Sequence, residues 1–229
     1  MSKITAAITA TGAYVPETIL TNAMLENMVD TNDEWITTRT GIKERRILKT
    51  KGEGTSFLAI KAANDLIQKT NLDPNTIDLV IVATATPDMK AASTASYTAT
   101  KIGANNAFSF DMDSACSGFL FGMSTAASFI ESGRYKKVLL IGADKMSSIV
   151  NYDDRATCII FGDGAGATLF EPNEEGLGMR DEYLRTDGNG REFLQATYGG
   201  SSNPITHEVL ESGGHYAFQE GKTVFKNAV

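Results

Sequence analysis

The stretch AFSFDMDSACSGFLF, residues 107–121, changes its pattern halfway along and thereby decides the fold. Residues 107–112 alternate apolar and polar side chains, which predicts a short strand. After Cys116, apolar residues recur every three or four positions until Gly133, which predicts a helix. We therefore expect Cys116 at a strand-to-helix junction, on the first turn of the helix.

This position favours a reactive role for the Cys116 side chain. Unpaired backbone N–H groups and the helix dipole stabilise a thiolate at a helix start, and the thiolate is the nucleophilic form of cysteine. The neighbours of Cys116 are small and leave room for a ligand: Ser114, Ala115, Ser117 and Gly118. The alternative is a buried cysteine packed as a small apolar residue. The turn and the small neighbours favour a nucleophile.

The rest of the chain alternates strand and helix patterns, which predicts the α/β fold class. Apolar stretches at 77–84 and 137–144 predict strands that are buried on both faces. An alternating stretch at 4–14 predicts another strand, and amphipathic helices are expected at 54–70 and 94–102. The alternation predicts a mostly parallel or mixed sheet with helices on both sides, with reactive groups at the carboxyl ends of its strands.

The composition is that of an acidic globular protein. A formal net charge of -7 over 229 residues argues against nucleic-acid binding, because no basic excess is present to neutralise phosphates. Without a secretory segment or a long apolar run, the chain is expected in the cytoplasm and away from membranes. Cys116 and Cys158 are expected as free thiols, with Cys158 a structural residue in an apolar strand.

One segment of this acidic chain is basic. Residues 39–51 hold six cations against the single acid Glu44: Arg39, Lys43, Arg45, Arg46, Lys49 and Lys51. Taken alone, such a run indicates a solvated face. The only tryptophan, Trp35, lies one helical turn before Arg39, so the ring and the guanidinium can share a helix face. An aromatic ring beside fixed positive charge suits a nucleotide that carries phosphates.

A glycine-rich stretch, GDGAGA at residues 162–167, is weak as a binding motif. It lacks the lysine of a phosphate-binding loop and the spacing of a dinucleotide fingerprint, which disfavours nucleotide hydrolysis. We interpret it as a tight turn joining two strands, because glycine permits close backbone approach.

Three motifs together resemble the beta-ketoacyl-[acyl-carrier-protein] synthase III family. They are DEWITTRTGIKERR at 33–46, SACSGFL at 114–120 and DRATCIIFGDGAGA at 154–167. The resemblance runs along the whole chain and implies a thiolase-like fold layered α-β-α. It implies the first condensation of type II fatty acid synthesis, in which a cysteine takes an acyl group, usually acetyl, from coenzyme A. Malonyl on acyl carrier protein then loses carbon dioxide, and its carbanion attacks the acyl-enzyme.

The resemblance also implies roles and partners. Cys116 would be the acylated nucleophile, and its own N–H would contribute to an oxyanion hole. Six residues would contact the coenzyme A thioester: Thr31, Trp35, Arg39, Arg155, Gly221 and Phe225. In the family, Trp35 and Arg155 match a pair that sandwiches the adenine, Arg39 a contact on the phosphate side, and Thr31 a nearby polar contact. The implied partners are acyl-CoA, malonyl-acyl carrier protein and a second copy in a homodimer, with no permanently bound cofactor and no metal.

Two positions depart from the family pattern in the ligand region. Gly221 and Phe225 match a segment along the pantetheine channel, but Lys222 stands where a common family member has asparagine. The loop PDMKAAST, residues 87–94, lacks the phenylalanine that some members insert into the acyl pocket of the partner subunit. The starter acyl group is therefore left open.

The residues for the condensation step lead to a further expectation. The family uses a histidine and an asparagine against the enolate, and neither His207 nor His215 matches that histidine; both are expected as exposed loop residues. An apolar helical face reaches the last residue, Val229. We expect a first half over 1–172 and the opening of a second over 173–229, with Cys116 acylated but condensation lost. The alternatives are a non-catalytic thiolase-fold fragment that only dimerises, and a related CoA-dependent acyltransferase or polyketide starter synthase.

Overall fold

The structure is a computed structural model, and it describes residues 4–228 of the chain. These residues form two compact units, each built from separate stretches of sequence. Unit 1 holds the residues up to Pro16 together with Leu48–Lys145 and Asp163–Leu184, and unit 2 holds Glu17–Ile47, Met146–Gly162 and the residues from Arg185 onward. Each unit is described by itself. The division into 1–172 and 173–229 stays a prediction.

A mixed five-stranded sheet forms the centre of unit 1. Its strands are β1 (Thr5–Tyr14), β4 (Leu79–Ala83), β5 (Phe108–Met112), β6 (Val138–Lys145) and β7 (Asp163–Asn173), in the order β1-β7-β6-β4-β5. β4 pairs in parallel with β5 and β6, whereas β7 pairs antiparallel with β6 and β1. The sheet confirms the mixed topology that the sequence predicts.

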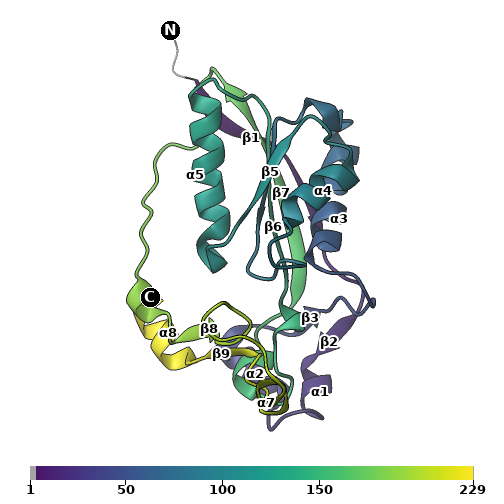
Figure 1. Ribbon diagram of the computed structural model, residues 1–229, viewed down its shortest axis with the longest axis vertical. Coiled ribbons are helices and arrows are strands. Elements are labelled where there is room, and N and C mark those ends of the chain that lie inside the picture. Colours follow the sequence, from purple (N-terminus) through teal and green to yellow (C-terminus); the bar gives the residue numbers. More distant parts are fainter. Residues whose placement is uncertain (1–3, 229) are drawn as a thin grey trace. The chain divides into compact units, whose positions relative to one another are not determined.

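Helices cover both faces of this sheet (Figure 1). α3 (Thr55–Thr70) and α4 (Thr94–Ile102) lie on one face, and α5 (Gly118–Glu131) lies on the other. Every residue of β4 is buried, because its side chains alternate between the two apolar cores. Two short 3-10 helices, η1 (Pro74–Thr76) and η2 (Ala115–Ser117), complete the unit. The layered fold class is therefore confirmed.

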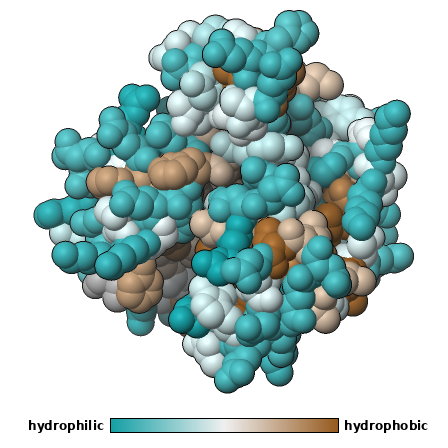
Figure 2. Space-filling model, turned by 90° about the horizontal axis from the view of Figure 1, so that it is seen from below, coloured by the Kyte–Doolittle hydropathy of each residue, from teal (hydrophilic) through white to brown (hydrophobic). Residues whose placement is uncertain are grey.

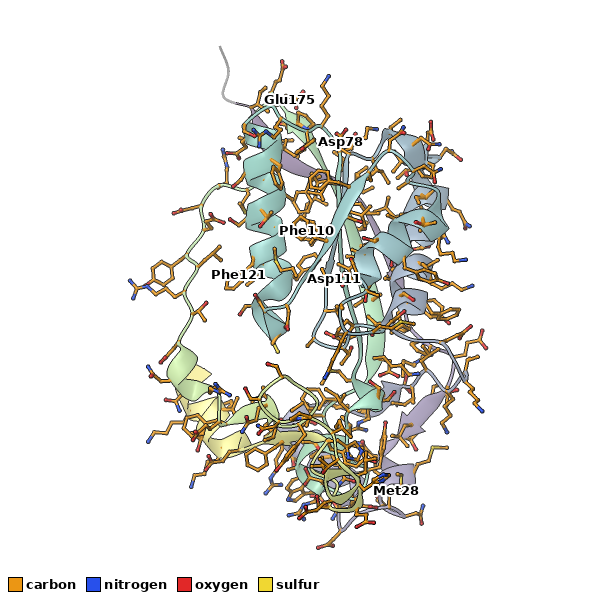
Figure 3. All side chains as sticks on the ribbon, in the orientation of Figure 1. Met28, Asp78, Phe110, Asp111, Phe121 and Glu175 are labelled. Atoms are coloured by element: carbon orange, nitrogen blue, oxygen red, sulfur yellow. The ribbon has the colours of Figure 1, made fainter. Side chains whose placement is uncertain are left out.

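Strand β5 shows how alternation connects the two layers of helices. Phe110 packs in the core beneath α5, whereas the neighbouring Asp111 points to the start of α4 (Figure 3). The Asp111 carboxylate accepts hydrogen bonds from Thr94 N at 2.8 Å and from Ala95 N at 2.6 Å. It thereby satisfies N–H groups that the first helical turn leaves without helical partners. β5, which leads to Cys116, is fixed from both sides.

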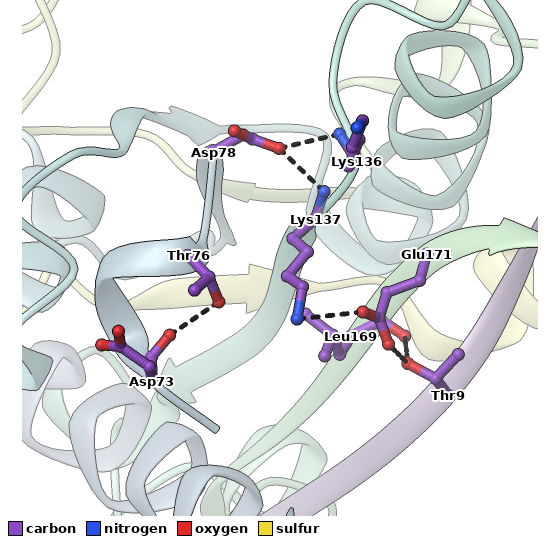
Figure 4. A network of polar contacts seen from close by, with 8 residues as sticks. All are labelled: Thr9, Asp73, Thr76, Asp78, Lys136, Lys137, Leu169 and Glu171. Carbon is purple, nitrogen blue, oxygen red and sulfur yellow. Dashed lines mark hydrogen bonds and ion pairs between the residues drawn. The ribbon is translucent and has the colours of Figure 1, made fainter. Parts of the chain in front are cut away.

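A polar network ties four strands together at the other end of the sheet (Figure 4). The Asp78 carboxylate accepts from the backbone N–H groups of Lys136 and Lys137, at 2.7 and 2.9 Å. Lys137 Nζ pairs with Glu171 Oε1 at 3.1 Å, and Thr9 Oγ1 donates to Glu171 Oε2 at 2.5 Å. The network joins the start of β4 to β6, and then to β7 and β1.

Two expectations for unit 1 are corrected. The GDGAGA stretch is no turn, because from Asp163 it is part of β7, which lies between β1 and β6. On α3, Ala63 and Leu66 are buried as their spacing predicts, whereas Phe57, Ile60 and Ile67, expected inward with them, are half-buried and Leu58, Ala59 and Ala62 are buried instead. Alanine fits there because β1 passes close to α3. A Cβ added at Gly12 would lie 2.6 Å from Leu66 N.

Unit 2 consists of short elements. They are β2 (Ile19–Thr21), α1 (Asn22–Leu25), α2 (Asp33–Thr40), β3 (Glu44–Arg46), η3 (Met146–Ser148), α6 (Arg155–Cys158), η4 (Gly188–Gly190), β8 (Leu194–Ala196), α7 (His207–Glu211), β9 (Ala217–Gln219) and α8 (Gly221–Ala228). The strands form two antiparallel pairs, β2 with β3 and β8 with β9. A small core of Leu25, Ile36 and Val150 packs with the residues at the end of α6. Apolar side chains also reach the surface and lie among hydrophilic ones (Figure 2).

The caps of unit 2 follow the sequence. Thr21 caps α1 and Asn32 caps α2, and α2 ends at Gly41, whose φ of 72° is left-handed. α1 ends at Leu25. Phe218 lies on β9. Val229 lies outside the described residues.

Candidate active site

Cys116 lies on an exposed turn at the carboxyl end of β5. The strand ends at Met112, and Cys116 is the middle residue of η2, directly before α5 begins at Gly118. The predicted junction is confirmed, although the cysteine precedes the first residue of the helix and does not lie on its first turn. The side chain is exposed and carries a free thiol. A ligand in solvent can therefore reach the sulfur.

The backbone of this turn is strained directly before the cysteine. Ala115 has a φ of 45°, in the left-handed region that residues with a Cβ rarely adopt. Such a conformation costs about 1–2 kcal/mol relative to an ordinary one. Strain of this kind persists only where the surrounding structure imposes it, and it is common at active sites. At the same junction, α/β hydrolases hold their nucleophile on a sharp, strained turn.

Burial of Gly118 and two backbone hydrogen bonds help to hold this turn. Gly118 is buried, and a Cβ added there would lie 3.4 Å from Ala83 Cβ at the end of β4. The turn is closed by hydrogen bonds from Ser117 N to Ser114 O, at 3.1 Å, and from Gly118 N to Ala115 O. Neither of these bonds uses the N–H of Cys116.

Cys158, the second cysteine, has the opposite environment. It is fully buried in the core of unit 2, at the end of the short helix α6, so the predicted strand at this position is wrong. Burial raises the pKa of the Cys158 thiol, and the nearby Asp154 carboxylate raises this pKa further. A thiol of this kind stays protonated and unreactive, which agrees with a structural role.

Trp35, Arg39 and Arg155 lie together in unit 2. The Arg39 Cζ lies 4.4 Å from the centroid of the Trp35 ring, as the one-turn spacing along α2 predicts. The Arg155 Cζ lies 4.9 Å from the same centroid, although Arg155 comes from α6. The structure thus places two guanidiniums against the only tryptophan.

Hydrogen bonding holds Arg155 in this position. Its Nη1 donates to the Asp30 carbonyl at 2.8 Å and lies 3.9 Å from Asp30 Oδ2. A guanidinium within about 6 Å of a ring centroid is in direct contact with the ring. No space is therefore left for a third flat group between Trp35 and Arg155. A base that stacks there must displace the Arg155 guanidinium.

The remaining predicted ligand contacts also lie in unit 2. Thr31, next to Asp30, keeps its Oγ1 buried without a hydrogen-bond partner among the described residues. Gly221 is the first residue of α8, and a Cβ added there meets no atom within 4 Å. Internal packing therefore does not require glycine at this position. On the same helix, Phe225 is 69% exposed, which is unusual for so large an apolar side chain.

The structure changes the interpretation of the basic segment. Arg45 is 3% exposed and donates to the Ile159 carbonyl and to Asn22 Oδ1, so it does not belong to a solvated face. Burial lowers the pKa of its guanidinium. The sequence gives no signal for this position, because charge patterns do not separate a buried arginine from its exposed neighbours.

The histidines are partly as expected. His207 is exposed, but it begins the short helix α7 and is not in a loop. His215 is half-buried, with its ring 4.0 Å from that of Tyr216, which corrects the expectation of an exposed residue. No group of three or more His, Cys, Asp or Glu side chains within residues 4–228 is placed to hold a metal ion. In the same residues, no helix has both the length and the apolar character needed to cross a membrane.

Part of the chain matches a known protein family. The family model described as 3-oxoacyl-[acyl-carrier-protein (ACP)] synthase III matches residues 110–188, which include Cys116 and Arg155. Among individual proteins, the chain is 58% identical over 229 residues to beta-ketoacyl-[acyl-carrier-protein] synthase III 2 of Bacteroides thetaiotaomicron. That alignment covers 100% of this chain and 68% of the relative.

Solved structures agree with the sequence matches. The structure of beta-ketoacyl-[acyl carrier protein] synthase III from Thermus thermophilus superposes with a TM-score of 0.85 at 38% identity, covering 97% of this chain and 67% of that one. The priming beta-ketosynthase of the R1128 polyketide pathway gives a TM-score of 0.85 at 31% identity, covering 96% and 65%. This chain spans about two thirds of the length of these proteins.

Proposed function

This chain belongs to the beta-ketoacyl-[acyl-carrier-protein] synthase III family of acyltransferases, and we propose that its Cys116 accepts an acyl group from coenzyme A. The observation that carries the proposal is the placement of Cys116. Its thiol is exposed on a strained turn, at the carboxyl end of a parallel strand and directly before a helix. Reactive groups of α/β proteins collect at such strand ends.

The acyl transfer follows from the chemistry of a thiolate and a thioester. Cys116 Sγ, as the thiolate, attacks the carbonyl carbon of acyl-CoA and forms a new C–S bond. The carbonyl oxygen becomes an oxyanion, and we propose the N–H of Cys116 as a donor to that oxygen. The bond from carbon to the sulfur of coenzyme A then breaks, and coenzyme A leaves as a thiolate that takes a proton from solvent. The product is an acyl thioester on Cys116.

The nucleotide end of coenzyme A is assigned to unit 2. Trp35 offers a ring for the adenine, and Arg155 covers the base after it moves off the ring. Arg39 supplies a cation for the phosphates. Thr31 Oγ1 offers a hydroxyl that has no hydrogen-bond partner within residues 4–228, and the open space at Gly221 and the exposed ring of Phe225 suit the pantetheine arm.

Acetyl-CoA is the proposed donor, and malonyl-acyl carrier protein is the proposed partner in the following condensation, which starts type II fatty acid synthesis. We place this reaction in the cytoplasm, on a homodimer. For the present polypeptide we assign only the first half-reaction to named residues. Neither His207 nor His215 matches the family histidine that stabilises the enolate. The two halves of the reaction are therefore tested separately.

Mass spectrometry of the intact chain tests the acyl transfer. After incubation with acetyl-CoA, we expect a mass increase of one acetyl group, located on the peptide that contains Cys116. Cys116→Ala should abolish this labelling, whereas the matched variant Cys158→Ala should keep it, because the Cys158 thiol is buried. Labelling that survives in Cys116→Ala contradicts the assignment. Addition of malonyl-acyl carrier protein then tests the condensation step separately.

A polyketide priming role is the second candidate, because a priming ketosynthase matches at the same TM-score as the Thermus thermophilus enzyme. The identity of 58% to the Bacteroides thetaiotaomicron relative favours fatty acid synthesis over this role. The donor distinguishes the two. Faster loading of Cys116 from a longer acyl-CoA than from acetyl-CoA would favour polyketide priming.

A further inference from the structure

Trp35 and Arg155 come from separate short helices, so their spacing has to be set by other groups. α2 has eight residues and α6 has four. Helices this short do not hold their shape in water without tertiary contacts. A ring-to-guanidinium distance of 4.9 Å between them requires a link from one helix to the other.

A buried arginine on β3 supplies one end of such a link. Arg45 Nε donates to the Ile159 carbonyl at 3.0 Å, and Arg45 Nη2 donates to the same oxygen. Ile159 is the C-cap of α6, where backbone carbonyls lack helical partners and a cation is favoured. Arg45 therefore fixes the end of the helix that carries Arg155.

A buried asparagine continues the link to α2. Arg45 Nη1 donates to Oδ1 of Asn22, which is 2% exposed. Asn22 Nδ2 in turn donates to Asp33 Oδ1 at 2.7 Å and lies 3.3 Å from Thr37 Oγ1. Asp33 and Thr37 stand one helical turn apart on α2 and flank Trp35 in the sequence. An unbroken polar chain thus runs from α6 to α2 through the interior of unit 2.

We propose that Arg45 and Asn22 are a positioning pair that sets the spacing of Trp35 and Arg155, and thereby the affinity of unit 2 for the nucleotide end of coenzyme A. This inference rests on the proposed function, since it takes coenzyme A as the ligand. In this proposal neither Arg45 nor Asn22 contacts coenzyme A. The competing account is that apolar packing around Ile36 places the helices and the polar chain only fills the interior.

Trp35 reports on the spacing directly, because it is the only tryptophan of the chain. Coenzyme A is titrated against the 229-residue protein, and the dissociation constant is read from tryptophan fluorescence. We expect Arg45→Met to weaken binding about 10- to 100-fold, the scale that a misplaced contact produces. In the free protein the same variant should be more readily quenched by acrylamide, because the Arg155 guanidinium no longer covers the ring in a fixed arrangement.

Two milder variants keep the test valid if Arg45→Met does not fold. Arg45→Lys retains a cation that reaches one acceptor, and it should restore part of the affinity. Asn22→Asp keeps an oxygen for Arg45 but loses the N–H donor to Asp33, and it should weaken binding. Unchanged affinity in both variants overturns the proposal.

Two controls separate positioning from general destabilisation. Arg46→Met changes the neighbouring, half-exposed arginine of β3 and should leave the affinity unchanged. Ile36→Val lowers the stability of the same core without touching the polar chain, and it should also bind normally. If Ile36→Val weakens binding as much as Arg45→Met does, packing sets the spacing and the proposal is wrong.

A wild-type chain that does not bind coenzyme A contradicts the proposed function. In that case acrylamide quenching still tests whether Arg45 sets the spacing of Trp35 and Arg155. Quenching of Arg45→Met equal to that of the wild type contradicts this role.

Discussion

At the scale of single residues, the strained Ala115 affects the stability of the chain and the reactivity of Cys116 in opposite ways. Ala115 holds a left-handed φ of 45° that glycine adopts freely. Relief of about 1–2 kcal/mol of strain is partly offset by the larger entropy of an unfolded chain with an extra glycine, about 0.4–1 kcal/mol. The alanine therefore lowers stability slightly while it restricts the turn that carries Cys116.

We predict that Ala115→Gly stabilises the chain by roughly 0.5–1 kcal/mol and slows acetylation of Cys116. Urea unfolding gives the first quantity and time-resolved mass spectrometry gives the second. The matched control is Ala91→Gly, at another left-handed residue of unit 1 with a φ of 69°, which should stabilise without slowing acetylation. Unchanged acetylation in Ala115→Gly would show that the turn needs no restriction at this position.

At the scale of elements, α4 depends on a carboxylate from a different strand. Asp111 accepts from Thr94 N and Ala95 N, and its loss leaves these N–H groups without their acceptor. We predict that Asp111→Ala destabilises the chain by about 1–3 kcal/mol, measured by urea unfolding. Ser109→Ala is the control. Ser109 lies two positions earlier on β5 and its hydroxyl donates to the exposed Ser96 hydroxyl at 3.0 Å, so its loss should cost less than about 0.5 kcal/mol.

Element boundaries show what the sequence can predict and where it fails. α4 occupies residues 94–102 as predicted, because its serine cap, its apolar face and the glycine that ends it are all local signals. The prediction of a turn at 162–167 is wrong. The glycines suggest a turn, but pairing with β1 and β6 makes the stretch part of a strand from Asp163 onward. The prediction of a strand at Cys158 is wrong for a similar reason. Apolar neighbours do not distinguish a buried strand from a buried helix end.

The candidate site likewise has features that the sequence predicts and features that it does not. Cys116 and the pairing of Trp35 with Arg39 follow from short-range spacing, so they could be predicted from the residues themselves. The contact of Arg155 with Trp35 joins positions far apart in sequence, and only the family resemblance anticipated it. Arg45 and Asn22 could not be found at all, because burial of a charged side chain depends on the tertiary structure that surrounds it.

At the scale of the whole molecule, close packing of β1 on α3 is a requirement for unit 1. Gly12 is buried, and a Cβ there would lie 2.6 Å from Leu66 N and 2.8 Å from Leu66 Cβ. Backbone at this distance cannot be displaced without moving α3 from the sheet. We predict that Gly12→Ala costs about 3 kcal/mol or more in the free energy of unfolding, measured by urea denaturation. Gly166→Ala on the neighbouring strand β7 has open space at its Cβ and is the control.

The order of strands in unit 1 has a consequence for synthesis on the ribosome. β1 is synthesised before the other strands of this sheet, yet its neighbour in the sheet is β7, and Thr5 pairs with Asn173. A nascent chain that grows by about 5–20 residues per second has to add roughly 160 more residues before that partner exists, which takes about 10–30 s. During this time the N-terminal strand is a free edge that chaperones or other nascent chains can bind.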